Sequence, residues 1–361
     1  MESHIVSKAQ AVNIFRTSAG AEIFQIPVEV FPDFWGFVYL VLVQQAADGL
    51  GDGRDASPGD GEYRVLIDTG SGFGNCNQHL ENGLQAVSEH TGRSLQLSDL
   101  THVFITHGHI DHFGGLSYVR SRTPARIGVH ELDLRNLTNY EERLILVSRR
   151  LDAFLIEAGV SPQRRHTLTD MYKLTKSLYR SVKVDFTYEA LGMRLGPFQM
   201  LHVPGHSAGH VVIRLHDVLF SGDHVLDRTS PHQSPEHLTL STGLRHYLHS
   251  LELLRPWAAG VRLTLGGHKD AMRDLPKRLD QIRALHQDRL AQVTQLLEAP
   301  HTVSDVSHKL FGEVHGYNVL LALEEAGAHV EYLYQLGKLG INNLAELENN
   351  PNPTPILYYR L

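Results

Sequence analysis

Three histidines and one aspartate occupy a short stretch that follows a run of apolar residues. In FITHGHIDHFGG, residues 104–115, these side chains are His107, His109, Asp111 and His112. Imidazole and carboxylate are the ligands that zinc takes in proteins, at about 2.0 to 2.2 Å. Alternation along an extended loop sends His107 and His109 to the same side, and the other two follow after the chain turns. One short loop can therefore contact two neighbouring metal ions.

Four ligands are too few for two metal ions, so further ligands must come from other parts of the chain. HVPGHSAGH offers His206, VLFSGDHVL offers Asp223, and LTLGGHKD offers His268. Each of these residues follows a short apolar run typical of a strand, at the point where a glycine-bearing loop begins. Because α/β architectures collect their active sites where rigid strands meet variable loops, we expect these side chains to converge.

The ordered motifs HxHxDH, PGHS, SGD and GGH, preceded by Asp68 in LIDTG, resemble the metallo-β-lactamase superfamily of metallohydrolases. The resemblance covers about residues 22–275. It implies an αββα four-layer sandwich, in which two sheets lie face to face with helices outside. It also implies a pair of metal ions at one edge of the sandwich, with Asp68 beneath them and hydrogen-bonded to a ligand.

The resemblance also implies which residues bind each metal ion. The first ion would be held by His107, His109 and His206. The second would be held by Asp111, His112 and His268, with Asp223 bridging the two ions. The implied cofactors are two zinc ions, with iron or manganese as alternatives.

Differences from individual branches of the superfamily limit the branches to which this chain can belong. Class B β-lactamases lack the bridging aspartate, so Asp223 argues against antibiotic hydrolysis as the native activity. Flavodiiron proteins carry a glutamate where this chain has His109, which disfavours a diiron redox site. Glyoxalase II shares the ligands, but its glutathione-binding domain does not resemble residues 299–361. Those residues, through EEAGAHVEYLYQLGKL, resemble the winged-helix appendage of LACTB-like hydrolases, some of which are ribonucleases and others thioesterases.

The helices and strands that must position these residues alternate along the chain. Strand, glycine-bearing loop and helix recur to about residue 270, which predicts a layered α/β catalytic domain over residues 1–275. CNQHLENGLQAVSEHTG predicts a helix closed by glycine. Residues 46–62, rich in glycine and aspartate, predict a flexible hairpin excursion.

Two further parts interrupt or follow this alternation. Residues 131–182 predict two or three amphipathic helices, interpreted either as an insertion packed on the core or on a second subunit, or as a lid. A lid would carry Phe154, Tyr172 and Tyr179 over the site. Residues 276–298 predict a connecting helix. Residues 299–361 predict a small winged-helix-like domain of two helices, a glycine turn and a terminal strand.

Composition limits the classes of function. A net charge of −7, with no long basic run, argues against duplex nucleic acid as the main partner. A single cysteine, Cys76, cannot form an internal disulfide, and the opening MESHIVSKAQ lacks the layout of a signal peptide, so we expect a cytoplasmic protein. The longest apolar stretches are about half of what a membrane-spanning helix needs. We expect no membrane contact.

The chain has 24 histidines, far more than the metal scheme uses. The group that lies in or beside predicted strands is interpreted as structural: His102, His130, His202, His216 and His224. His210 closes the PGHSAGH turn and is a candidate for a role near the metal. His232 and His237 are candidates for lining the substrate pocket, with a surface loop as the alternative.

The ligand set predicts a metallohydrolase in which a hydroxide held by the two metal ions attacks a small ester-like substrate: a thioester, a lactone or a related acyl compound. Asp111 is a candidate for orienting water or protonating the leaving group, and Asp68 for fixing an imidazole. The alternatives are an RNA-cleaving phosphodiesterase, an iron-dependent sulfur dioxygenase, and a binding protein without turnover. The acidic character of residues 299–361 disfavours the ribonuclease.

Overall fold

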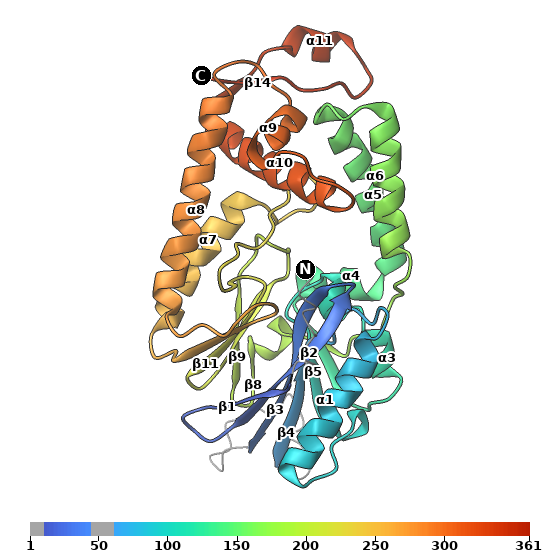
Figure 1. Ribbon diagram of the computed structural model, residues 1–361, viewed down its shortest axis with the longest axis vertical. Coiled ribbons are helices and arrows are strands. Elements are labelled where there is room, and N and C mark those ends of the chain that lie inside the picture. The colour runs from blue at the N-terminus through green and yellow to red at the C-terminus, as the bar shows by residue number, and fades with distance from the viewer. Residues whose placement is uncertain (1–10, 45–60) are drawn as a thin grey trace, which may run out of the picture.

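The computed structural model describes residues 11–44 and 61–361. Two sheets lie in the lower half of Figure 1, with helices beside them. In the first sheet, the strands lie side by side in the order in which they occur in the chain. Neighbouring strands from β1 to β4 are antiparallel, and those from β4 to β7 are parallel. Its strands are β1 (Asn13–Arg16), β2 (Glu22–Phe31), β3 (Phe34–Gln44), β4 (Glu62–Ile67), β5 (His102–Phe104), β6 (Arg126–Val129) and β7 (Phe186–Thr187).

The second sheet has the strand order β12-β11-β10-β9-β8. β11 and β12 are parallel, and the other neighbours are antiparallel, so β9, β11 and β12 all run in the same direction. Its strands are β8 (Arg194–Leu195), β9 (Phe198–His202), β10 (Val211–Leu215), β11 (Val218–Gly222) and β12 (Leu263–Gly266). The strands that precede His206, Asp223 and His268 therefore end on the same side of this sheet.

A buried apolar layer joins the two sheets. Tyr39 and Val41 of β3 belong to the same cluster as Ile213 of β10 and Phe220 of β11. The alternate residues of β3, such as Leu40, belong instead to a cluster with the helices outside the first sheet. Because both faces of β3 are covered, its sequence is a nearly continuous apolar run rather than an alternating one.

Helices cover the outer face of each sheet. The first sheet is covered by α1 (Cys76–Thr91), α2 (Ile110–Phe113), α3 (Leu116–Arg120) and α4 (Glu131–Thr138). The second is covered by α7 (Leu244–Leu254) and α8 (Leu275–Leu296). α1 ends at Gly92, whose φ of 66° is the left-handed conformation expected at a glycine stop. Short 3₁₀ turns lie at Leu97–Asp99, Glu189–Leu191 and Pro256–Ala258.

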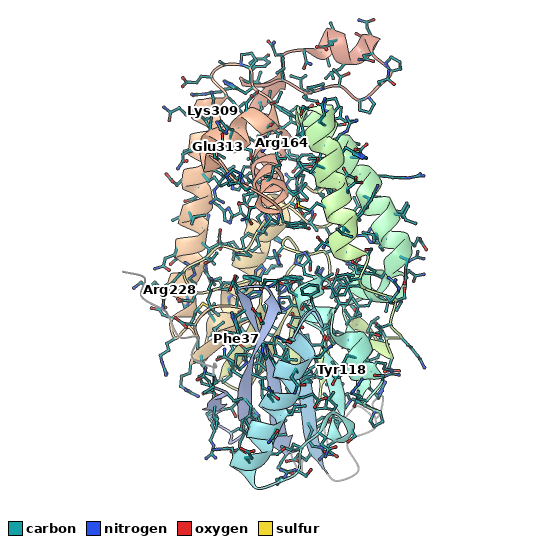
Figure 2. All side chains as sticks on the ribbon, turned by 45° about the vertical axis from the view of Figure 1, so that its right-hand side comes forward. Phe37, Tyr118, Arg164, Arg228, Lys309 and Glu313 are labelled. Atoms are coloured by element: carbon teal, nitrogen blue, oxygen red, sulfur yellow. The ribbon has the colours of Figure 1, made fainter. Side chains whose placement is uncertain are left out.

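The remaining helices form a second body at the other end of the molecule (Figure 1). The helices are α5 (Tyr140–Glu157), α6 (Pro162–Lys176), α9 (Val303–Phe311), α10 (Asn318–Gln335) and α11 (Leu344–Asn349). Two short strands, β13 (Leu339–Ile341) and β14 (Tyr358–Arg360), belong to the same body. In Figure 2, Arg164 of α6 lies at the same end as Lys309 of α9, whereas Phe37 and Tyr118 mark the sandwich.

The insertion and the C-terminal residues share one core. Phe154 and Leu155 of α5 pack in a cluster with Leu323 and Ala326 of α10. Backbone hydrogen bonds join the same parts, since Ser304 N donates to the Ala158 carbonyl at 2.8 Å. Phe154 therefore serves this core and is not part of a lid over the site.

The predicted layered α/β architecture is confirmed by these sheets and helices. The domain boundaries at 275 and 298 remain a prediction. Residues 1–10 and most of the predicted 46–62 excursion lie outside the described residues. Within the described ranges, no helix combines the length and apolar character needed to cross a bilayer.

The pH dependence of stability is predicted from His286 of α8, which is fully buried against His329 and Tyr247. Burial lowers its pKa from 6.5 to about 4, so between these values the unfolded chain binds a proton that the folded chain does not. Stability should therefore fall as the pH drops from about 6.5 toward 4, by roughly 1 kcal/mol at about pH 5.5 for this residue.

Urea unfolding of metal-free protein at about pH 7.5 and about pH 5.5 measures this loss. His286→Phe should reduce the difference in unfolding free energy between the two pH values by roughly 1 kcal/mol. The same substitution at exposed His315 is the control. An equal pH dependence in the wild type and in His286→Phe would contradict the prediction.

Candidate metal centre

The seven predicted ligands come together in two adjacent groups. The first consists of His107, His109 and His206, and the second of Asp111, His112, Asp223 and His268. Within each group, the potential ligand atoms all lie within 4.8 Å of one another. Each ligand, or the loop that carries it, directly follows one of the strands β5, β9, β11 and β12, so the two sheets jointly position both groups.

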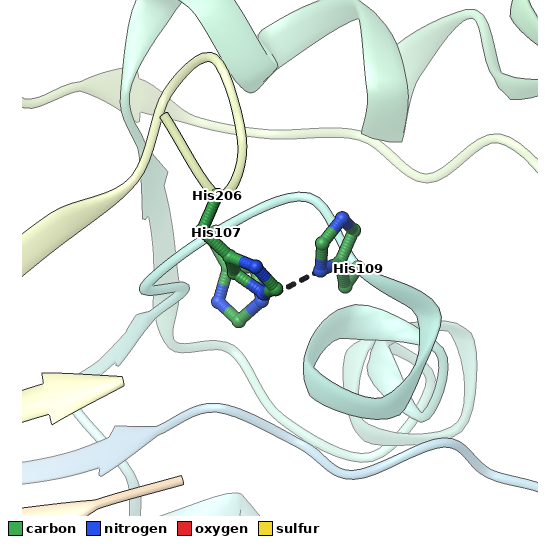
Figure 3. Close-up of side chains that lie close together, drawn as sticks. All are labelled: His107, His109 and His206. Atoms are coloured by element: carbon green, nitrogen blue, oxygen red, sulfur yellow. Dashed lines mark hydrogen bonds between the residues drawn. The ribbon is translucent and has the colours of Figure 1, made fainter. Parts of the chain in front are cut away.

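The first group is made by two loops, as Figure 3 shows. His107 and His109 flank Gly108 in the loop after β5, and His206 lies in the loop after β9. His107 Nε2 and His109 Nδ1 are 3.1 Å apart, and the rings of His109 and His206 are 4.4 Å apart between centroids. Three imidazoles that face one another in this way can bind a transition metal through one nitrogen each.

The second group surrounds the carboxylate of Asp223. Asp223 Oδ1 lies 3.4 Å from His112 Nε2, and Asp223 Oδ2 lies 3.5 Å from His268 Nε2. The same Oδ2 is 3.9 Å from His206 Nε2 of the first group. His268 Nε2 is also 3.3 Å from Asp111 Oδ2. The Asp223 carboxylate therefore lies close to ligand atoms of both groups.

Hydrogen bonds hold the other nitrogen of several ligand rings. His112 Nδ1 lies 2.8 Å from Asp68 Oδ2, so Asp68 contacts a ligand as the sequence predicts. His206 Nδ1 lies 2.7 Å from the His232 carbonyl, and His268 Nδ1 lies 2.7 Å from the Trp35 carbonyl. Because each acceptor receives the hydrogen bond of Nδ1–H, Nε2 is the nitrogen that each neutral ring offers to a metal ion.

Several buried atoms at the centre have no hydrogen-bond partner among the described residues. They are His112 Nε2, His206 Nε2, His268 Nε2 and Asp223 Oδ1. A buried polar atom without a partner is costly, and these converge on the same space. Their types also match the ligand preferences of zinc, iron and manganese. The residues present therefore fit a pair of divalent metal ions.

The electrostatics differ between the two groups of predicted ligands. Burial holds the pKa of His107 and of His109 well below 6.5, so both rings are neutral. Burial alone would lower the pKa of His112, but the carboxylates of Asp223, Asp68 and Asp111 raise it well above that value. This concentration of negative charge would attract a divalent cation.

Asp133 is a buried residue that the sequence analysis did not identify. It lies in the first turn of α4, and its Oδ2 accepts hydrogen bonds from Gly108 N at 2.8 Å and from Ser207 Oγ at 3.2 Å. It therefore ties together the loops that carry the first group. The sequence does not distinguish Asp133 from Glu131, which is also a carboxylate in the first turn of α4 but is exposed.

Gly267 allows the second group to pack closely. A Cβ atom at this position would lie 2.4 Å from the His112 ring and 2.5 Å from Asp223 Oδ1. These separations are too short for any side chain, so the glycine before His268 is required by space.

The C-terminal residues also support the first group. His232, whose carbonyl accepts the His206 hydrogen bond, pairs through its ring with Glu324 of α10 at 2.9 Å. The next residue, Gln233, donates its backbone N–H to Glu325 Oε2 at 2.7 Å. His237 pairs with Glu331 at 2.8 Å, farther along the same helix. α10 thus fixes the segment that orients His206.

The other histidine candidates have supporting contacts. His210 is fully buried, stacks on His107 at 4.6 Å, and its Nε2 accepts the Asp223 backbone N–H at 3.0 Å. It therefore contacts the backbone of a predicted ligand. His237 is half exposed and lies against α10 rather than against either ligand group.

A third buried group, His286, Glu325 and His329, has the residue types of a metal site. Glu325 forms an ion pair with Arg289, and His329 Nδ1 bonds the Glu325 carbonyl at 2.7 Å. The Arg289 guanidinium would repel a cation here, so this group is interpreted as a polar link between α8 and α10.

Comparison with known proteins identifies a family. The family model described as the metallo-beta-lactamase superfamily matches residues 59–296. The probable metallo-hydrolase YqjP of Bacillus subtilis (strain 168) is 25% identical over 287 residues, which make up 76% of this chain and 85% of that protein.

Two solved structures share the fold. A metallo-beta-lactamase family protein from Thermus thermophilus has a TM-score of 0.70 at 24% identity, with 94% of this chain and 98% of that chain covered. A beta-lactamase domain protein from Burkholderia ambifaria has a TM-score of 0.67 at 21% identity, with 97% and 94% covered. The αββα prediction is thereby confirmed, and the shared fold extends over nearly the whole chain.

The support from Asp68 gives a testable prediction. Asp68→Asn keeps the shape of the residue, and asparagine tolerates the positive φ of 61° at this position. It removes the charge that fixes His112, so we expect about 10- to 100-fold weaker metal binding. Zinc retained after dialysis against a competing chelator measures the effect.

Asp288→Asn, the same change at an exposed position of α8, is the control. Circular dichroism should show that both variants are folded. Undiminished zinc retention in folded Asp68→Asn would contradict the predicted role of Asp68.

Proposed function

This chain belongs to the metallo-beta-lactamase superfamily, as a metallohydrolase, and we propose that it cleaves a small ester-like substrate at a centre of two divalent metal ions. The proposed substrates are a thioester, a lactone or a related acyl compound. The single observation that carries the proposal is the position of Asp223, which adjoins both groups of ligand atoms and leaves Oδ1 without a hydrogen-bond partner among the described residues.

The first group would hold one ion through His107, His109 and His206, and the second group the other through Asp111, His112 and His268. When bound, two such ions lower the pKa of a water molecule toward neutrality and stabilise negative charge that develops on an acyl oxygen. Zinc suits this mixture of imidazole and carboxylate best, and iron and manganese are the alternatives.

The protein's own residues contribute orientation and proton transfer. Asp68 and the carbonyls of His232 and Trp35 hold the imidazoles, so that little rearrangement is needed on binding. Asp111 is partly exposed, in contrast to His112 and Asp223. Its carboxylate is therefore the candidate for passing a proton to a leaving group in contact with solvent.

The charge and the contacts of the C-terminal residues favour a small substrate over nucleic acid. The C-terminal residues contain α9, α10, β13, α11 and β14, with β13 and β14 paired antiparallel, and we propose that they form a winged-helix-like unit of the LACTB-like branch. Its basic residues are Lys309, Lys338 and Arg360, outnumbered by carboxylates. Its long helix α10 supports the loop that orients His206. We therefore propose that this unit shapes the pocket wall.

The function is tested by metal analysis followed by assays of a substrate panel. The panel contains thioesters, lactones, a single-stranded RNA and a glutathione persulfide, each assayed with the metal-reconstituted and the chelator-treated protein. We expect chelation to abolish hydrolysis of a thioester or lactone and metal addition to restore it.

Asp223→Ala should lower kcat/KM by about 100-fold or more, because it removes the residue shared by both groups. Asp227→Ala, a nearby change outside both groups, is the control. RNA cleavage or oxygen uptake with the persulfide, without ester hydrolysis, would replace the proposed function. Full activity in Asp223→Ala would rule out the paired-metal site.

A further inference from the structure

The metal centre has one side that is less buried than the rest. His107, His112, His206, Asp223 and His268 are buried, whereas His109 and Asp111 are partly exposed. A substrate therefore reaches the centre from the side of His109 and Asp111.

A cluster of polar and aromatic residues from the insertion and the C-terminal unit lies on this side. Two of these residues, Tyr172 and Lys176, belong to α6. Glu324 belongs to α10, and Tyr317 directly precedes that helix. We call these four residues the α6–α10 cluster. Lys176 is tied to this side of the centre through Tyr140, which bonds the Lys176 backbone. The ring of Tyr140 lies 5.8 Å from the ring of Phe113 in α2, the helix that carries Asp111. The charge of Lys176 is also within electrostatic range of Asp111 and Glu324. The Tyr317 phenol interacts with the charges of Asp111 and Glu324 and lies near Tyr172.

Lys176 is held in place by its surroundings. It is the last residue of α6, where the partial negative charge of the helix end favours a cation. Its backbone carbonyl accepts a hydrogen bond from Tyr140 Oη at 3.0 Å. Its Nζ lies 5.3 Å from the centroid of the Tyr172 ring, within the range of a cation–π contact. The backbone of Lys176 is therefore held by Tyr140, and its ammonium lies over the Tyr172 ring.

No carboxylate of residues 11–44 and 61–361 forms an ion pair with Lys176. Glu324, which interacts with its charge, is already bound to His232 at 2.9 Å. Burial lowers the pKa of Lys176, as expected for an ammonium that has lost much of its water without gaining a direct counter-ion. A cation in this position is unfavourable next to a centre that itself binds cations.

An anionic ligand would relieve this arrangement, because it would supply the missing counter-ion on the open side of the centre. We propose that Lys176 binds an anionic group of the substrate, a carboxylate or a phosphate, that lies beside the hydrolysed bond. The flat rings of Tyr172 and Tyr317 flank this group, and Glu324 stays engaged with His232, which leaves the ammonium free for the ligand. This inference rests on the proposed function insofar as it takes the substrate to bind at the metal centre.

Binding is tested with thioethers, which cannot be hydrolysed. Calorimetry on the zinc-loaded full chain compares S-(3-carboxypropyl)-N-acetylcysteamine with its methyl ester, and S-butyl-coenzyme A with S-butyl-N-acetylcysteamine. The first pair tests a carboxylate, and the second a phosphate-bearing ligand. We expect the wild type to bind at least one anionic member about 10- to 100-fold more tightly than its neutral counterpart.

The variants separate charge from structure. Lys176→Met should abolish the preference for the anionic member, and Lys176→Arg should retain much of it. Lys173→Met is the matched control, because Lys173 lies on the same helix and is exposed. It should bind as the wild type does, and the thermal midpoints of all variants confirm that each is folded.

Hydrolysis is measured separately with S-succinyl- and S-butyryl-N-acetylcysteamine and with butyryl-coenzyme A. Anion preference that depends on Lys176, without turnover of any thioester, would support the anion site and count against the proposed thioester chemistry. Equal binding of the anionic and neutral members by the wild type, or an unchanged preference in folded Lys176→Met, would overturn the inference.

Discussion

The convergence of unpartnered nitrogen and oxygen atoms around Asp223 is the constraint on which the rest of the structure depends. Within the described part of the chain, His112 Nε2, His206 Nε2 and His268 Nε2 are buried without hydrogen bonds, and Asp223 Oδ1 has none either. Without a cation, these atoms would cost free energy that apolar packing must offset. The fold maintains the arrangement because the ligands lie in loops after strands or in α2, and because His112, His206 and His268 are each held by a hydrogen bond on the other ring nitrogen.

This constraint extends beyond the sandwich. The carbonyl of His232 orients His206, and His232 is itself held by Glu324 of α10. α10 packs in turn against Phe154 and Leu155 of the insertion. The insertion and the C-terminal residues therefore form one support, which acts on the centre through the loop that carries His232. The similarity in fold to two solved structures covers this support as well as the sandwich.

The ligands could be predicted from the sequence because they occur in short motifs directly after apolar runs, as His107, Asp223 and His268 do. Their supports could not be predicted in the same way. The carbonyls of Trp35 and His232 carry no signal, since every residue has a carbonyl and only the fold determines which one meets an imidazole. Asp133 was missed because a buried carboxylate in a helix looks the same in sequence as an exposed one. The lid interpretation fails for Phe154, which contributes to a core. Lys176, which the sequence did not single out, is the residue of the insertion whose charge lies within electrostatic range of Asp111.

The position of Lys176 follows from the same combination of parts. A cation near a centre that holds metal ions would be repelled by them, so a sandwich alone would gain nothing by placing one there. The charge is tolerated because α6 ends at this residue, Tyr172 offers its ring, and Glu324 of α10 lies within electrostatic range. Those three features come from the insertion and the C-terminal unit, which approach each other only because they share a core. The parts outside the sandwich therefore have a physical basis for selecting the substrate, whereas the sandwich supplies the chemistry.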